Sequence, residues 1–277
     1  MNPNEDESHE TSYAPIPDQL EGVVAKILRA GALLAEIDQL ALQFMMGNSP
    51  TFDVVPNLTH RSYTVTAHVP SPPLSIAVMF GEVLHNLRSC LDHVARLLVL
   101  AAGGTPVDKP PRATSFPILL DAPSRSLGVF PGIRPEALEA IESLQPYRSA
   151  EGERHPLWRL SILNNIDKHR LLHVTSLSGA GGVAFVPAPL DPEASTTQEQ
   201  RRHTVRLLPE QPQVFLATAA EMHDPAAMAG LWSYTVVLGE PGAGFRDQVV
   251  GVGHELLDFV ADQVLPTLAS FTLPPQR

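Results

Sequence analysis

Four stretches of the chain repeat apolar residues at the three- and four-residue spacing of an amphipathic helix. They are residues 18–47, 75–102, 157–172 and 245–265. Gly47 and the pair Gly103-Gly104 are expected to end the first and the second helix, because glycine readily closes a helix. Pro266 is expected to end the last one. The pattern therefore predicts a core of long helices, of which 75–102 is the central helix.

Strand-like residues gather in two other regions. Residues 52–69 contain two β-like runs with a turn near 57–60, which predicts a hairpin. Residues 174–239 form a β-rich part, in which short runs are separated by glycine, proline and charged turns. The order helix, hairpin, helices, strands, helix predicts an α+β fold, with a long-helix core and a packed antiparallel β-sheet.

The length of 277 residues allows one or two domains, and the pattern favours a single domain at 18–277. Residues 1–17 are polar, acidic and interrupted by prolines, which is typical of a disordered tail. No apolar run reaches the roughly 18 residues that a membrane span needs. The start also lacks the basic and apolar regions of a signal peptide. We therefore expect a cytoplasmic protein without membrane contact.

The net charge and the single cysteine exclude several classes of function and of site. The formal net charge is −11, which argues against non-specific coating of nucleic acid, since that binding needs a large phosphate-neutralising surface. Residues 154–173 are an exception, because they hold four Lys or Arg side chains, three His and one Asp. Cys90 is the only cysteine and lies on the apolar side of the central helix. Intramolecular disulfides and four-thiolate metal sites are thereby excluded.

The central helix has one polar face, which spans roughly 160° at about 100° per residue. It carries Glu82, His85, Asn86, Arg88, Ser89, Asp92, His93 and Arg96. A helix face that is exposed to water is usually rich in Lys, Glu and Gln, which lose little rotamer freedom in a helix. Two His, two Arg, an Asn and an Asp instead indicate a hydrogen-bonded network.

The helix at 157–172 has a similar stripe. It consists of Ser161, Asn164, Asn165, Asp167 and Lys168. If the two stripes face one another, Arg88 pairs with Asp167, because neither charge can be buried alone. Asp92 pairs with Lys168 for the same reason. On this interpretation Asp92 and Asp167 belong to a structural network that fixes the register of the two helices.

Arg88 and His93 are separated by four residues on the central helix. Here the chain resembles HEPN domains, helical modules of which many are metal-independent RNases and whose motif is an Arg, four to six residues and a His. The resemblance implies that Arg88 binds the scissile phosphate and His93 transfers a proton, as the two catalytic residues. Ser89 would occupy the polar position after the Arg. The expected substrate-binding residues are His85, Asn86, Ser89, Asn164 and Lys168.

The longer strings HNLRSCLDH and NNIDKHR also resemble those of a family of uncharacterised bacterial proteins. That resemblance spans more of the chain and implies a bacterial source, but no activity.

A metal site is a further candidate, because His169 and His173 lie four residues apart. The Glu of an HExxH pattern is missing, and the neighbouring Lys168 and Arg170 would repel a cation. The chain also lacks a Walker A loop. We therefore expect no metal and no cofactor.

Two classes of function stay open. The first is an enzyme, either a HEPN-like metal-independent ribonuclease or another enzyme that acts on a phosphate-containing substrate. The second is a non-catalytic binding or assembly protein whose polar stripes form a structural network. The expected partner is RNA or a protein, with a homodimer as one form of assembly. The two classes differ in the exposure of Arg88 and His93: a solvent-reachable cleft favours the enzyme, and sealed, paired side chains favour the binding protein.

Overall fold

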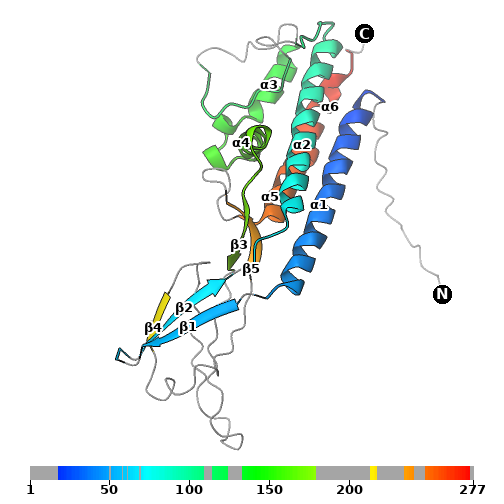
Figure 1. Cartoon of the computed structure of the whole chain (residues 1–277). Helices are drawn as coiled ribbons and strands as arrows, with labels where there is room; N and C mark the ends of the chain where they lie inside the picture. The colour runs from blue at the N-terminus through cyan, green and yellow to red at the C-terminus, as the bar shows by residue number, and fades with distance from the viewer. Residues whose placement is uncertain are drawn as a thin grey trace, which may run out of the picture.

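The computed structural model describes residues 18–49, 51–57, 59–60, 62–68, 70–108, 114–123, 133–178, 213–216, 234–239 and 247–274. Within these residues the fold is mostly helical and carries two small antiparallel sheets (Figure 1). The predicted tail at 1–17 and most of the predicted β-rich part at 174–239 lie outside the described residues.

The long helices form a bundle. They are α1 (Glu21–Gly47), α2 (Leu74–Ala101), α4 (Pro156–His169) and α5 (Val249–Asp258), which continues into the π-helical η6 (Phe259–Val264) and α6 (Leu265–Ala269). Shorter elements are α3 (Pro135–Ser143) and the 3-10 turns η1 (Asp18–Leu20), η2 (Pro146–Arg148), η3 (Gly152–Arg154) and η7 (Ser270–Thr272). Helix α2 packs against α1, α4 and α5, so it lies at the centre of the bundle (Figure 1).

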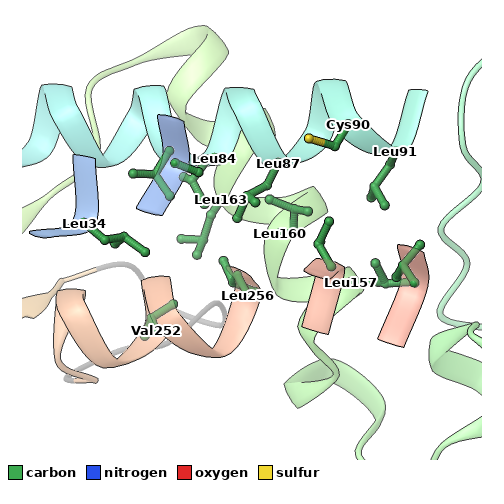
Figure 2. Packing of buried hydrophobic residues seen from close by; sticks show 14 of the residues in the cluster. Leu34, Leu84, Leu87, Cys90, Leu91, Leu157, Leu160, Leu163, Val252 and Leu256 are labelled. Carbon is green, nitrogen blue, oxygen red and sulfur yellow. The ribbon is translucent and has the colours of Figure 1, made fainter. Parts of the chain in front are cut away.

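Apolar side chains from four helices meet in one core. Leu34 of α1, Leu84 of α2, Leu163 of α4 and Leu256 of α5 are each no more than 1% exposed (Figure 2). Burial of a leucine side chain stabilises a fold by about 1.5–3 kcal/mol, so these residues hold the helices together. Cys90 lies in the same core, where burial raises the pKa of its thiol to about 12. Its thiol is therefore protonated and unreactive at neutral pH.

The prediction that Pro266 ends the last helix is wrong. The helical segment runs through Pro266 to Ala269, and the π-helical turns of η6 directly precede it. Proline has no N–H, and in an α-helix its ring collides with the carbonyl group four residues earlier. The wider turn of a π-helix relieves that collision, which lets the helix continue.

The first sheet contains three strands in the order β1-β2-β4. Its members are β1 (Thr51–Asn57), β2 (Ser62–His68) and β4 (Gln213–Leu216). β1 and β2 form a hairpin in the region 52–69, with Thr51 opposite His68 and Asn57 opposite Ser62. The second sheet pairs β3 (Val174–Ser178) with β5 (Tyr234–Leu238) in antiparallel register.

The single sheet that we predicted on the helices is split, and the fold is α+β only in the loose sense of a helical bundle with minor sheets. β1 begins four residues after α1 ends, so the hairpin leaves from the end of the bundle and the three-stranded sheet lies beyond it (Figure 1). The second sheet adds to the core through Val236 and Leu238. Among the described helices, none combines the length and the apolar character that crossing a bilayer requires.

Candidate functional site

An open cleft of about 320 Å³ lies where α4 packs against α2. Its lining consists of Val78, Gly81, Glu82, His85 and Asn86 from α2, Asn164, Asp167 and Lys168 from α4, and Leu171 beyond it. The structure thus brings together four of the predicted substrate-binding residues, namely His85, Asn86, Asn164 and Lys168. Ser89 lies further along α2 and is not part of this lining.

Gly81 of α2 lies directly against the side chain of Asp167 on α4. A Cβ atom at this position would lie 2.6 Å from Cγ of Asp167, and its three nearest atoms would all belong to that carboxyl group. Only glycine therefore lets the carboxyl group of Asp167 lie directly against the backbone of α2. The contact fixes which turn of α4 meets which turn of α2.

Asp167 has no hydrogen-bond or ion-pair partner among the described residues. Burial raises the pKa of its carboxyl group, and the nearby charge of His85 opposes that rise. The predicted pairing of Asp167 with Arg88 is wrong. Among the described residues the Asp167 carboxyl group forms no ion pair and lies near the His85 imidazole in a cleft, an arrangement that is suited to proton transfer.

Asn164 is the second unusual residue of the cleft. Its side chain lines the cleft although the residue is only 4% exposed, and its amide has no hydrogen-bond partner in the described part of the chain. Leaving a buried polar group without a partner costs about 1–3 kcal/mol. Native proteins contain few such groups, so each one requires an explanation.

The remaining polar groups lie at the rim. Asn86 donates its Nδ2 hydrogen to the carbonyl oxygen of Glu82 at 2.8 Å. The Glu82 carboxylate lies 3.8 Å from Nη2 of Arg29 on α1, in an exposed ion pair. Lys168 is exposed and forms no ion pair within the described residues. As far as the described residues show, its ammonium group is therefore available to a ligand.

Arg88 and Asp92 form a different structure from the one predicted. Nη2 of Arg88 donates to Oδ1 of Asp92 and to the carbonyl oxygen of Phe116, both at 2.9 Å. The N–H of Phe116 donates to the same Oδ1, also at 2.9 Å. Both polar groups of the Phe116 backbone are therefore satisfied, and its ring is 1% exposed in the core. We call this set the Arg88–Asp92 clamp.

The predicted pair of Asp92 with Lys168 is also wrong, for a geometric reason. Helix α4 meets α2 at Gly81, seven residues before Arg88, which corresponds to about 10 Å along the helix axis. Arg88 and Asp92 then satisfy each other within α2, one turn apart. Asp92 is therefore part of the Arg88–Asp92 clamp. Asp167 is not, so the two carboxylates do not form one network.

His93 is exposed and lies outside the lining of the cleft. Five residues along a helix correspond to a rotation of about 140° from Arg88, so the two side chains leave α2 in different directions. The structure therefore does not bring Arg88 and His93 together in this cleft.

Sequence reasoning missed a buried arginine of α4 that pairs with two partly exposed carboxylates, one just before α5 and one on it. Arg159 is 7% exposed, and its Nη2 lies 2.8 Å from Oδ2 of Asp247 while Nη1 contacts Glu255. The available signal was its position, because Arg159 lies four residues before the buried Leu163 and thus on an apolar face of the helix.

His155 is a second buried polar residue that the pattern did not single out. Its Nδ1 accepts the N–H of Leu157 at 3.2 Å and caps α4, and its ring packs edge-on against Phe259 at 5.0 Å. Burial lowers the pKa of the imidazole. A neutral ring fits this role, because a protonated Nδ1 can no longer accept a hydrogen bond.

Among the described residues, no group of three or more His, Cys, Asp or Glu side chains is placed to hold a metal ion. Comparison of the chain with models of protein families, with curated proteins and with solved structures found no match.

Proposed function

We propose that this chain is a metal-independent enzyme that acts on a phosphate-containing substrate and that the cleft between α2 and α4 is its active site. One observation carries the proposal: Asp167, whose pKa is raised by burial and which has no described cation partner, shares the cleft with His85 and Lys168. Perturbed titratable groups inside a cleft are typical of catalytic sites.

The residues match the needs of phosphoester cleavage. That reaction requires a group that removes a proton from the attacking oxygen, a group that protonates the leaving oxygen, and a donor that stabilises the developing negative charge. Asp167 and His85 supply the two proton-transfer groups. Lys168 supplies the cation at the rim.

The HEPN-like ribonuclease is the form of this proposal in which RNA is the substrate and Arg88 and His93 are catalytic. Arg88 already donates to Asp92 and to the Phe116 carbonyl group. It would have to leave the clamp before it could bind a phosphate. We therefore place catalysis at His85 and Asp167 and treat the Arg88 and His93 motif as a separate arm of the test.

A non-catalytic binding or assembly protein is the second candidate. The Arg88–Asp92 clamp favours it, because part of the polar face of α2 has a structural role there. On this reading the cleft binds its ligand without changing it.

The test is cleavage of single-stranded RNA and of the chromogenic diester bis(4-nitrophenyl) phosphate in the presence of EDTA. We expect His85→Ala and Asp167→Asn to lower the rate by about two to four orders of magnitude. The matched control is His60→Ala, at an exposed histidine in the turn of the hairpin. All variants are checked for folding by circular dichroism.

The outcomes separate the candidates. Loss of activity in His85→Ala but not in His93→Ala supports the cleft. Loss in folded His93→Ala with full activity in His85→Ala moves the active site to the HEPN-like motif. If the wild-type protein cleaves neither substrate, the enzyme proposal fails and the binding protein is preferred.

A further inference from the structure

The buried amide of Asn164 indicates what kind of group the cleft receives. A carboxamide presents one acceptor oxygen and an NH₂ donor side by side. Asn164 is 4% exposed and lacks a partner among the described residues, so a ligand that presents a donor and an acceptor on neighbouring atoms can satisfy both of its polar atoms at once. The edges of nucleobases carry such pairs, and asparagine pairs with adenine in this bidentate way.

Two apolar side chains border the same cleft, one from each wall. Val78 of α2 is 46% exposed and Leu171, just beyond α4, is 41% exposed. Large apolar side chains at a cleft rim gain free energy when a flat apolar surface covers them. A nucleobase offers both features, since its faces are apolar and its edge is polar.

The size of the cleft and the position of Lys168 at its rim are compatible with a nucleotide. Its volume of about 320 Å³ is at the lower end of the range of small-molecule pockets, which is roughly 300–1,000 Å³. Lys168 lies one residue from Asp167 and one helical turn from Asn164, so a cation stands beside the buried amide. A phosphate group on the ligand would bind at that cation.

We infer that the cleft binds a nucleobase whose edge is hydrogen-bonded by Asn164 and whose faces lie against Val78 and Leu171, with the attached phosphate at Lys168. This inference rests on the proposed function and names the substrate class of that same site, a nucleotide. The groups involved differ from the proton-transfer pair, so binding and cleavage can be tested separately.

The test is calorimetric titration of the full chain with adenosine monophosphate and with ribose phosphate, both in EDTA. The second probe has the same phosphate and sugar but no base. We expect the base to improve the affinity by about tenfold or more, since two satisfied hydrogen bonds and the covered apolar surface each contribute. A non-cleavable 2′-O-methyl oligoadenylate is the third probe: tighter binding than the mononucleotide points to RNA as the source of the base, and equal binding points to a free nucleotide.

Two variants and one control assign the binding to the cleft. Asn164→Leu should reduce the affinity for adenosine monophosphate to that for ribose phosphate. It should not lower the melting temperature, because the amide that it removes forms no hydrogen bond within the described residues and the apolar side chain that replaces it is of similar size. Leu171→Ala, at an exposed position that needs no repacking, should weaken adenosine monophosphate binding severalfold. The control Leu100→Ala changes an equally exposed leucine, 49% exposed at the far end of α2, and should leave binding unchanged.

Equal affinities of the wild-type protein for the two small probes would overturn the nucleobase site. So would unchanged binding of adenosine monophosphate by folded Asn164→Leu and Leu171→Ala. These results are distinct from a failure of the proposed function: cleavage of the chromogenic diester without base-dependent binding refutes only the nucleobase site. Base-dependent binding without any cleavage supports the site and refutes the enzyme.

Discussion

Gly81→Ala tests the contact that sets the geometry of the whole cleft. The new methyl group would lie 2.6 Å from Cγ of Asp167, whereas ordinary carbon contacts are about 3.5–4 Å. The carboxyl group therefore has to move by about 1 Å. Such overpacking costs about 1–3 kcal/mol, and alanine returns about 1 kcal/mol through its better helix propensity. The net expectation is destabilisation by about 0–2 kcal/mol.

The sign of the effect should reverse when the carboxyl group is removed. In an Asp167→Ala background the three atoms nearest to the new methyl group are absent. Gly81→Ala should then stabilise the fold by up to about 1 kcal/mol, the helix-propensity gain alone. The coupling free energy between the two positions is therefore about 1–3 kcal/mol.

Urea denaturation of the wild-type protein, both single variants and the double variant measures this coupling. The matched control is Gly22→Ala near the start of α1, where a Cβ atom would meet nothing within 4 Å, so its effect should not depend on residue 167. If Gly81→Ala has the same effect in both backgrounds, Asp167 does not lie on Gly81. The cleft as described would then not exist, and the functional proposals built on it would fail together.

Three further predictions follow from the polar residues. Asp167→Asn should raise the free energy of unfolding at neutral pH. Burial raises the pKa of the Asp167 carboxyl group, so its contribution to stability is lost as pH rises from about 3.8 through the raised value. The amide of the variant does not titrate and should show no such loss. Urea denaturation across that interval measures it, and a parallel decline in both proteins would contradict it. Because the pKa of His155 is lowered by burial, its contribution should be complete above the ordinary value of about 6.5 and be lost as pH falls below it. His155→Asn, which keeps a capping side chain, should flatten that decline in melting temperature, and an unchanged decline would assign it to other groups. Arg88→Met should lower the free energy of unfolding by about 1–3 kcal/mol, because the buried carbonyl group of Phe116 and the half-buried Asp92 carboxylate lose their donor. The variant should also be cleaved faster by proteases near Phe116, and unaltered cleavage there would show that the clamp does not hold this segment.

Most polar residues of the cleft could be predicted from the sequence, because helical periodicity places them on one face of each helix, whereas the lining residues Val78 and Leu171 were not predicted. On α4, Asn164, Asp167 and Lys168 lie three and four residues apart and therefore must share one face. The same holds for His85 and Asn86 on α2 in relation to Glu82. The two polar stripes therefore form wherever the two helices form, independently of how the helices pack.

The pairing between the stripes could not be predicted, because periodicity says nothing about the register of two helices. That register depends on Gly81, because the absence of a side chain there leaves room for the carboxyl group of Asp167. Asp92, four residues after Arg88 on the same helix, could have been predicted as its partner. The second partner, the backbone of Phe116, could not, since it belongs to a segment without helical periodicity. The strand order was hidden for a related reason: β4 pairs with β2 across almost 150 residues of sequence.

The polar residues of α2 and α4 thus divide into two groups with opposite effects on stability. In the clamp, Arg88, Asp92 and the Phe116 backbone satisfy one another, which is what a purely structural network requires. In the cleft, Asn164 is buried without a described partner and Asp167 is held with a raised pKa, so each lowers the stability of the fold. Lys168 beside them forms no ion pair among the described residues, so the ligand proposed above would engage all three groups. Joint replacement by Asn164→Leu and Asp167→Asn should therefore give a more stable protein that neither binds nor turns over its ligand.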